Sequence, residues 1–507
     1  MAATAFIRKA NNKLTESVLR ALDGYLSFTG ETETSMRERI LSLPSAPMQR
    51  VCNAFVTYRD TVASSTVVAQ YVNSHPDVRE RRILQYMLSN TYRTPDLSLV
   101  FTAMKTLDPR ITFTRADATS CATYFGSDGV MRTAAANIPR FDYDPTTLAP
   151  KGLLIEESRA NLLTFSDQLD NAAWTKSNAT VTANAATSPD GTVNADKLVE
   201  NTATTVQHAA IRGATVTANT TYTASVYLKA AERPRARFTF STNVFSSGIT
   251  FNVNLSTGVI ANAITIGTGT LSGTSSTYVG NGWWRVTLTG IIDAATTSAS
   301  VTVYPDNGTT DAYTGDGASG IYVWGAQLEL GSFATSYIPT TTAAVTRAAD
   351  VAVMMGTNFS SWYNATEGTM LAEIVSAPVN NLTQIAYELN DGLGAGASRI
   401  FTRRNIAGLI GTATVTASVA QNDISPASVI AASATYKVAS AFKTNDYSIS
   451  VNGSTAVTSA TGTIPSTIAR LYLGQNYIGT QMLNGHIRSI RYYNTGLTDA
   501  QLQGMTL

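Results

Sequence analysis

Apolar and polar residues follow two different periods along this chain. In roughly the first ninety residues the apolar side chains recur every three or four positions, as Leu14, Val18 and Leu22 do, which is the period of an amphipathic helix. From Ile111 onward the period becomes two, in short runs such as Gly485-His-Ile-Arg-Ser-Ile-Arg-Tyr-Tyr, which is typical of half-buried strands. The pattern therefore predicts a small helical region followed by a large β region.

Turn signals separate the predicted strands at short intervals. They are Asp190-Gly191, Asn281-Gly282, Asp306-Asn307-Gly308, Asp391-Gly392 and Asn452-Gly453. Many short strands with such turns are typical of antiparallel sandwiches or barrels, and not of alternating strand–helix units. We therefore expect a mainly β protein whose sheets are antiparallel.

The chain is long enough for several domains. It has 507 residues, which suits about three domains of roughly 100–200 residues each. Charged residues are concentrated in the first 110 positions, and turn-rich or Thr-rich sequence near residues 141–151 and 340–350 marks further boundaries. The expected domains are a helical domain at 1–108, a short-strand connector at 109–151, and β domains at 152–345 and 346–507.

The last β domain allows the most specific local predictions. Strands are expected at residues 370–377, 384–389, 398–403 and 436–442. In the hairpin after Tyr447, Asn452-Gly453 is a dipeptide that favours positive φ at both positions. The final strand should be Gly485–Tyr493, after which Thr498 should cap a short helix over Asp499–Met505.

Composition narrows the range of partners. The formal net charge is +1, from 36 basic and 35 acidic residues, so no overall field attracts nucleic acid or an anionic membrane. The sequence shows no signal-peptide core at its start and no apolar run near the roughly 18 residues of a membrane span. We therefore expect a soluble, non-secreted protein with no nucleic acid partner and no membrane insertion. Cys52 and Cys121 are expected to be buried thiols.

Several motifs of the β region occur together in one known group of proteins. They are Gly152-Leu-Leu-Ile-Glu156, Arg159-Ala-Asn-Leu-Leu163, Asn171-Ala-Ala-Trp174, Tyr222-Thr-Ala-Ser-Val-Tyr-Leu-Lys229, Gly282-Trp-Trp-Arg-Val286 and Val323-Trp-Gly-Ala-Gln-Leu-Glu329. Through them, residues 109–507 resemble virion appendage proteins of phages and prophages, such as tail fibres, spikes and head fibres. Residues 152–345 resemble a carbohydrate-binding-module jelly roll. Residues 350–507 resemble a concanavalin A-like, laminin-G type sandwich, through Asp446-Tyr-Ser-Ile-Ser-Val-Asn-Gly453 and Leu483-Asn-Gly-His-Ile-Arg488.

The resemblance implies both a fold and a function. The implied fold is mainly β, with two antiparallel β-sandwiches, a jelly roll and then a concanavalin A-like sandwich, after a small N-terminal α-helical domain. The implied function is that of a structural protein at the surface of a phage or phage-like virion. Residues 1–108 would dock to other virion proteins, and the sandwiches of a homotrimer would bind host surface polysaccharide. Two alternatives stay open: a purely structural decoration protein without glycan binding, and a polysaccharide depolymerase.

Candidate sugar contacts follow from the chemistry of a pyranose, which needs an aromatic face for its C–H groups and planar polar groups for its hydroxyls. The candidates are Trp174, Trp283, Tyr304, Tyr313 and Arg235 in the jelly roll, and Arg403 and Tyr477 in the last sandwich. By contrast, Tyr227, Trp284 and Trp324 lie in alternating strands, which favours core positions. For the candidates as well, packing in the core or in solvated loops is the competing interpretation.

The sequence contains few residue patterns that indicate a metal or cofactor site. No motif requires a cofactor, and the three histidines have no partner at the spacing of transition-metal ligands. Jelly-roll binding modules that this chain resembles often hold a structural Ca²⁺. Its oxygen ligands could come from Asp190, Asp306 and Asp316.

Motifs of hydrolases are missing from the sequence. Glycoside hydrolysis needs two carboxylates about 5–10 Å apart. Concanavalin A-like glucanases resemble one another in a strand with two Glu around an Asp, and the segment around Glu388 does not have that pattern. The chain also has no Gly-x-Ser-x-Gly elbow and no phosphate loop. We therefore expect a protein that is not an enzyme.

Overall fold

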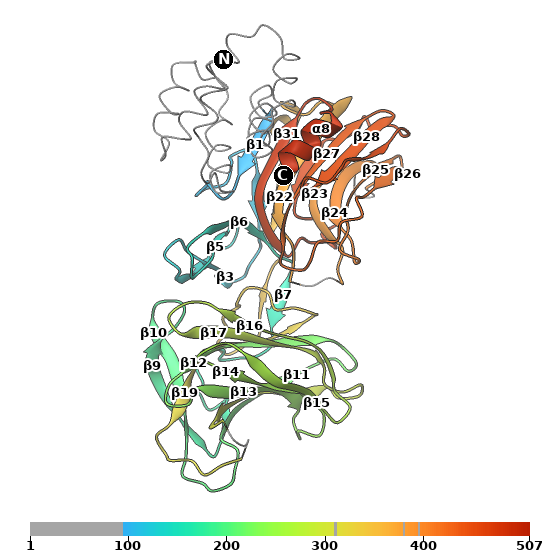
Figure 1. Cartoon of the computed structure of the whole chain (residues 1–507). Coiled ribbons are helices and arrows are strands. Elements are labelled where there is room, and N and C mark those ends of the chain that lie inside the picture. Colours follow the sequence, from blue (N-terminus) through green and yellow to red (C-terminus); the bar gives the residue numbers. More distant parts are fainter. Residues whose placement is uncertain (1–94, 309–311, 379–380, 394–395) are drawn as a thin grey trace, which may run out of the picture.

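The computed structural model describes residues 95–308, 312–378, 381–393 and 396–507. Within them the chain is mainly β, and its antiparallel sheets stack in two sandwiches (Figure 1). The predicted fold class is thereby confirmed for the β region. The helices predicted within the first ninety residues lie outside the described residues.

One sandwich, which we call the jelly-roll sandwich, is built from two six-stranded sheets. The first sheet runs in the order β16 (Thr270–Tyr278), β17 (Trp283–Ile291), β12 (Tyr222–Ala230), β19 (Gly320–Leu330), β10 (Val193–Glu200) and β9 (Ala179–Thr187). The second runs in the order β15 (Ile260–Ile266), β14 (Gly248–Asn254), β13 (Arg235–Thr242), β18 (Ser298–Asp306), β11 (Ala209–Thr215) and β8 (Thr175–Ser177). Alternate side chains of the two sheets, among them Phe238, Phe251 and Leu288, meet in one apolar core.

The other sandwich, which we call the C-terminal sandwich, has an eight-stranded and a seven-stranded sheet among the described residues. The first contains β29 (Val457–Ser459), β28 (Asp446–Val451), β27 (Thr435–Lys443), β22 (Glu367–Val375), β31 (Gly485–Tyr493), β6 (Pro150–Ile155) and β5 (Phe141–Tyr143), with β1 (Leu97–Val100) also paired to β31. The second contains β2 (Thr112–Thr114), β21 (Val351–Met355), β30 (Arg470–Leu473), β23 (Gln384–Asn390), β24 (Arg399–Arg404), β25 (Ile410–Thr416) and β26 (Val419–Ile424). Two short helices, α7 (Thr357–Ser360) and α8 (Asp499–Thr506), complete it.

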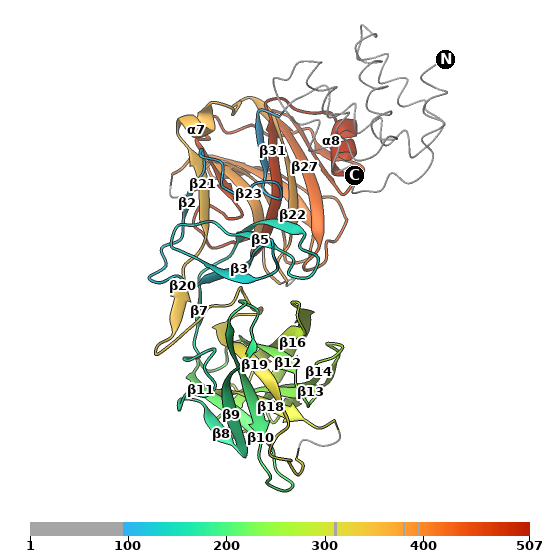
Figure 2. The ribbon, with the colours of Figure 1, turned by 90° about the vertical axis from the view of Figure 1, so that its left-hand side faces the viewer.

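The jelly-roll sandwich is an insertion in the C-terminal sandwich. β1, β2, β5 and β6 precede the jelly roll in the sequence, yet they belong to the sheets of the C-terminal sandwich. The chain leaves that sandwich along β7 (Arg159–Asn161) and returns along β20 (Val345–Arg347), which pairs antiparallel with β7 (Figure 2). The connector predicted at 109–151 is therefore not a separate segment. Alternation of side chains shows that a strand has one buried face, but it does not show which strand will be its neighbour.

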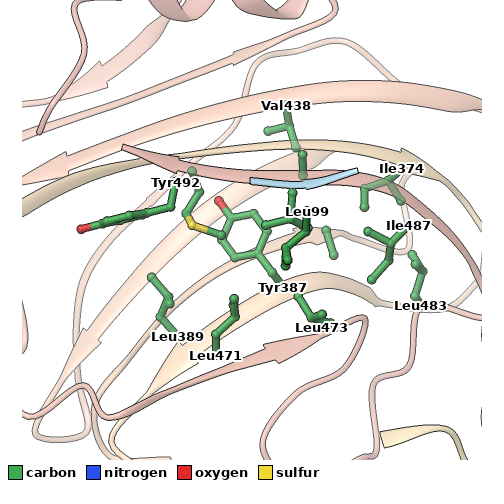
Figure 3. Packing of buried hydrophobic residues seen from close by; sticks show 14 of the residues in the cluster. Leu99, Ile374, Tyr387, Leu389, Val438, Leu471, Leu473, Leu483, Ile487 and Tyr492 are labelled. Atoms are coloured by element: carbon green, nitrogen blue, oxygen red, sulfur yellow. The ribbon is translucent and has the colours of Figure 1, made fainter. Parts of the chain in front are cut away.

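The core of the C-terminal sandwich shows how the two parts of the sequence combine. Tyr387 lies among apolar side chains from both sheets, including Leu99 of β1 (Figure 3). Its hydroxyl lies 2.6 Å from the hydroxyl of Ser440 and accepts a hydrogen bond from Thr402 at 2.7 Å. Because a buried polar group without partners is costly, this small network fixes how the two sheets face each other.

A hairpin from the first part of the sequence covers the jelly-roll sandwich. It consists of β3 (Ala122–Phe125) and β4 (Met131–Ala134). Met131 packs there with Trp283 and Trp324 in an aromatic cluster on the outer side of the sheet that contains β12 and β17. The backbone N–H of Met131 also donates to the carbonyl of Pro189, at 2.9 Å.

Buried ion pairs join the segments where the chain passes between the sandwiches. Arg140 pairs with Asp350 at 2.5 Å and with Glu156 at 2.8 Å, and Arg347 also pairs with Glu156. The hydroxyl of Ser336, in the segment that follows β19, donates to Glu156 at 2.7 Å. Glu156 therefore ties the end of β6 to the part of the chain that returns from the jelly roll, at Ser336 and at Arg347.

Most of the local predictions in the last domain are confirmed. β22, β23, β24 and β27 occupy the predicted positions within three residues, and β31 spans Gly485–Tyr493 as expected. Asn452 and Gly453 have φ of 48° and 75°. Thr498 caps α8 in a capping box with Gln501. Cys121 is buried with a free thiol, whereas Cys52 lies outside the described residues. None of the described helices is long and apolar enough to cross a membrane.

Candidate functional site

The four aromatic residues predicted to contact sugar in the jelly roll are all buried. Trp174 and Trp283 are 1% exposed, Tyr304 is 6% exposed and Tyr313 is 7% exposed. The indole N–H of Trp283 donates to the carbonyl of Thr187 at 2.9 Å, and its ring lies in the aromatic cluster under the β3–β4 hairpin. None of these rings presents a face to solvent. The four residues therefore pack inside the protein, as the competing interpretation predicted, and are not sugar contacts.

The two buried tyrosines have structural contacts. The Tyr313 hydroxyl donates to Glu200 at 2.7 Å, and burial together with this bond raises the pKa of Tyr313. Arg233 lies over its ring, 5.5 Å from the centroid. Tyr304 is covered in the same way by Arg237, at 5.2 Å.

The polar candidates are distributed over three places. Arg235, on β13, forms an ion pair with Asp306 at 3.3 Å. Arg403, on β24, forms an ion pair with Asp423 at 2.5 Å. Tyr477 is half-buried in the loop after β30, where the guanidinium of Arg399 lies 5.5 Å from its ring centroid. Arg403 and Tyr477 thus belong to the C-terminal sandwich and lie apart from Arg235.

The carboxylates proposed as calcium ligands have other partners. Asp190 accepts hydrogen bonds within its own turn from Ser188 at 2.6 Å and Thr192 at 2.7 Å. Asp306 accepts from Asn252 at 2.8 Å, and Asp316 accepts from backbone N–H groups of its own loop. In the described part of the chain no three candidate metal ligands gather in one place. The three predicted carboxylates are therefore not brought together.

A solvent-open hollow lies instead at one end of the jelly-roll sandwich, beside Trp284. Its volume is about 530 Å³, within the range of about 300–1,000 Å³ usual for small-molecule sites. It is lined by Lys229, Ala230, Leu255, Ser256, Thr257, Tyr278, Gly282 and Trp284. These residues come from the end of β12, the turn between β14 and β15, and the hairpin of β16 and β17. Both sheets of the sandwich therefore contribute to it.

The hairpin of β16 and β17 positions the two aromatic rings. Tyr278 and Trp284 are direct cross-strand partners, with ring centroids 5.0 Å apart. The turn between them contains Asn281 and Gly282, whose φ values of 52° and 81° suit the Asn-Gly signal seen in the sequence. The Gly282 N–H donates to the Tyr278 hydroxyl at 3.1 Å. The turn thus holds the Tyr278 ring, which is 41% exposed, at the rim of the hollow.

The turn between β14 and β15 fixes the indole of Trp284. The indole N–H donates to the carbonyl of Leu255 at 2.9 Å. Gly258, in the same turn, has a φ of 72° and lies so close that a Cβ there would be 2.1 Å from a ring carbon of Trp284. Only glycine leaves room for the ring in this position.

The hollow combines the groups that a neutral sugar needs. Tyr278 and Trp284 offer ring surface to the C–H groups of a pyranose. Ser256 and Thr257 carry exposed hydroxyls, and Lys229 also lines the hollow, with its ammonium 6.0 Å from the centroid of the Trp283 ring. Such a site favours binding and orientation of a sugar over acid–base chemistry, since its lining contains no carboxylate or imidazole.

Sequence reasoning took Trp283 as a candidate sugar contact and Trp284 as a core residue. Trp283 is 1% exposed beneath the β3–β4 hairpin, so it presents no face to solvent. Trp284 packs against the core of the jelly-roll sandwich, as expected, but it is half-buried and also lines the hollow, which was not predicted. The available signal was the run Tyr278 to Trp284, in which two aromatic residues flank an Asn-Gly turn at matching positions. That arrangement makes them cross-strand neighbours on one face.

Comparisons with known proteins identify distant β-sandwich neighbours only. No protein-family model and no curated protein sequence matches the chain. Among solved structures, the NanB sialidase from Streptococcus pneumoniae is 18% identical over 29% of this chain, with a TM-score of 0.25. The match spans about a quarter of that sialidase, 24% of its chain.

Two further neighbours are a binding module of a sialidase and a region of a laminin chain. The CBM40 of the Ruminococcus gnavus IT-sialidase, bound to α2,3 sialyllactose, is 18% identical over 29% of this chain and 86% of its own, with a TM-score of 0.26. The LG1-3 region of the laminin α2 chain is 9% identical over 57% of this chain and 65% of its own, with a TM-score of 0.22. The functional argument therefore rests on the hollow itself.

Proposed function

We propose that this protein binds glycans without transforming them, and that the hollow beside Trp284 is its sugar site. The observation that carries the proposal is the pair of cross-strand rings, Tyr278 and Trp284, which line a solvent-open hollow together with Ser256, Thr257 and Lys229. Aromatic faces with a few convergent polar groups are what a pyranose requires.

The biological setting we propose is the surface of a phage or phage-like virion. It is supported by the motifs shared with virion appendage proteins, such as Gly152-Leu-Leu-Ile-Glu156. In that setting residues 1–108 dock to other virion proteins, and the ligand is host surface polysaccharide. Assembly as a homotrimer would present three hollows at once, which raises avidity without any new contact. A structural Ca²⁺ in the jelly-roll sandwich also remains a proposal.

A glycan array probed with the full chain tests the function. We expect binding to a restricted set of neutral or amino sugars, and loss of that binding when Trp284 is replaced by alanine. The matched control is Phe245→Ala, because Phe245 is an aromatic residue, 37% exposed, in the turn between β13 and β14, whereas the hollow lies at the turn that follows β14. No binding to any host envelope polysaccharide would favour the alternative of a structural decoration protein.

A second measurement addresses the alternative of a depolymerase. The full chain is incubated with capsule or lipopolysaccharide, and released oligosaccharide is measured over time. We expect no release, because the hollow is lined without a carboxylate. Steady release of oligosaccharide by the purified chain would contradict the non-enzymatic proposal.

A further inference from the structure

The outer face of the seven-stranded sheet carries an ordered set of basic and aromatic side chains. Leu471, Leu389 and Ile400 point from β30, β23 and β24 into the core of the C-terminal sandwich. Because successive side chains of a strand point to opposite faces, the residues next to them lie on the outer face. That face is separate from the hollow, which lies on the other sandwich.

The strand register arranges these outer residues in two rows. In one row Arg470, Asn390 and Arg399 are direct cross-strand neighbours. In the next row Tyr472, Glu388 and Phe401 are direct cross-strand neighbours. Adjacent strands are about 5 Å apart, so Arg470 and Arg399 stand on either side of Asn390 in this row. Two long cationic side chains placed this way can both reach one anionic group.

Stacking holds the guanidinium of Arg399 in place. It lies 4.9 Å from the ring centroid of Phe401 and 5.5 Å from that of Tyr477. Arg403 covers the Phe401 ring at 5.4 Å. A guanidinium held on aromatic rings loses little freedom when it binds a carboxylate, which makes this geometry well suited to planar anions.

Several polar atoms of this face are buried without a hydrogen-bond partner among the described residues. They are the Nε atoms of Arg399 and Arg470 and the Oε2 atom of Glu388. Glu388 is fully buried, and its other oxygen accepts from Asn390 at 3.0 Å and from the backbone N–H of Tyr477 at 2.9 Å. A buried polar atom without a partner calls for an explanation, such as a bound water or ion. Three of the atoms of this kind lie on the one face, beside the stacked guanidinium of Arg399.

The charge balance of the face favours an anion. Burial raises the pKa of Glu388, although the hydrogen bond from Asn390 and the charge of Arg399 act against it. The ion pair between Arg399 and Glu388 is long, with 3.8 Å between Nη1 and Oε2. Because this ion pair is long and the Nε atoms of Arg399 and Arg470 have no hydrogen-bond partner among the described residues, both guanidiniums keep donor atoms for a ligand.

We propose that this face is a second ligand site and that it binds a sugar residue carrying a carboxylate, such as a hexuronic acid of an acidic polysaccharide. The carboxylate would lie between Arg399 and Arg470, and the ring of the sugar would contact Tyr472 and Tyr477. This site does not depend on the hollow beside Trp284. The chain would then bind a neutral sugar in the hollow and an acidic sugar on the outer face of the seven-stranded sheet.

Titration calorimetry with the full chain tests the proposal, with α-1,4-linked trigalacturonate as the probe. We expect binding of the acid, no binding of its methyl ester, and a loss of affinity of at least about tenfold in Arg470→Gln and in Arg399→Gln. The matched control is Arg132→Gln on β4, whose side chain is 51% exposed and pairs only with Asp128 among the described residues. Its affinity should equal that of the unaltered chain.

Each outcome of this titration either supports or overturns the acidic-sugar site. If trigalacturonate does not bind, or if both variants with substitutions on this face bind as the control does, the proposal is overturned. Equal competition by sodium sulfate at the same ionic strength would reveal a general anion site and would overturn the assignment to a sugar. Trp284→Ala should leave trigalacturonate binding unchanged, so a failed sugar site in the hollow and a failed acidic site give different results. Because either arginine variant could misfold, each is accepted only with an unchanged circular dichroism spectrum.

Discussion

Two adjacent residues, Trp283 and Trp284, have different environments, and this difference determines where the proposed sugar site lies. Strand alternation predicts that they point to opposite faces, and the structure agrees. Alternation does not say which face is covered. Trp283 is buried because Met131, on a hairpin far away in the sequence, packs against it. From the sequence, Trp283 is therefore one of several candidates and Trp284 is a core residue, and only the tertiary structure shows that Trp284 is the one that lines the hollow.

Gly258 should be required for sugar binding although it is not expected to touch the sugar. In Gly258→Ala the new methyl group would collide with the Trp284 ring, at a position with positive φ. We expect the indole to be displaced and the affinity for the glycan to fall by at least about tenfold, the equivalent of about 1.4 kcal/mol. Calorimetry measures the change. Gly273→Ala on neighbouring β16 is the control, because a Cβ there meets nothing within 4 Å, and equal losses in both variants would contradict this role.

Glu388 should make the binding of acidic sugar depend on pH. The pKa of Glu388 is raised by burial, with Asp391 adding to the rise and Arg399 opposing it. The neutral form, which favours an anionic ligand, is therefore populated at low pH and is lost as the pH rises through this raised pKa. We expect the affinity for trigalacturonate to decrease over that window.

The variant Glu388→Gln provides the control for this pH effect. Its amide is neutral at every pH, so its affinity should stay flat over the window in which the unaltered chain loses affinity. A decrease of the same size in the variant would show that another group is responsible.

Single elements of the C-terminal sandwich were predictable where the local sequence determines them. β31 follows from an apolar–polar alternation that a register shift near Arg488 interrupts, and α8 follows from the Thr498 capping box. The partners of β31 were not predictable, because β1 and β6 lie on the other side of the jelly roll in the sequence. Pairing across such a distance depends on which buried faces fit together, and the sequence of one strand does not contain that information.

The insertion predicts which fragments of the protein fold. A fragment of residues 348–507 lacks β1 and β6, so β31 loses its partners on one side and the core loses Leu99 and Ile155. We expect it to be insoluble or to lack a cooperative unfolding transition by circular dichroism.

A shortened chain that keeps the C-terminal sandwich and lacks the jelly-roll sandwich is the control for this fragment. Residues 95–507 with a Gly-Gly turn in place of 160–346 keep every strand of the C-terminal sandwich, because Arg159 and Arg347 are direct partners in the β7–β20 ribbon. This shortened chain should unfold cooperatively. If the fragment 348–507 folds as well as the shortened chain does, the insertion is not needed to explain the topology.

At the scale of the whole molecule, the buried ion pairs around Glu156 join the two sandwiches. Burial alone would raise the pKa of Glu156, but Arg347 and Arg140 outweigh it and lower the pKa. In Glu156→Gln both guanidiniums lose a buried charge partner, which should destabilise the protein by about 3–5 kcal/mol. Urea denaturation followed by tryptophan fluorescence measures the loss. Asp128→Asn, which breaks an exposed pair with Arg132, should have a much smaller effect.

The same carboxylate predicts part of the acid sensitivity of the protein. Because the pKa of Glu156 is lowered by folding, its contribution is present above the pKa of an unfolded glutamate and is lost as the pH falls through the lowered value. The unaltered chain should therefore lose more stability on acidification than Glu156→Gln does. Parallel pH profiles for the two proteins would contradict this assignment.

The central claim is that the hollow beside Trp284 binds a glycan, and one measurement tests it most directly. The affinity of the full chain for its best array glycan is measured by calorimetry in the unaltered protein, in Trp284→Ala and in Phe245→Ala. We predict that Trp284→Ala loses at least about tenfold in affinity, the equivalent of about 1.4 kcal/mol, while Phe245→Ala binds as the unaltered chain does. Undiminished binding by a correctly folded Trp284→Ala protein would contradict the account.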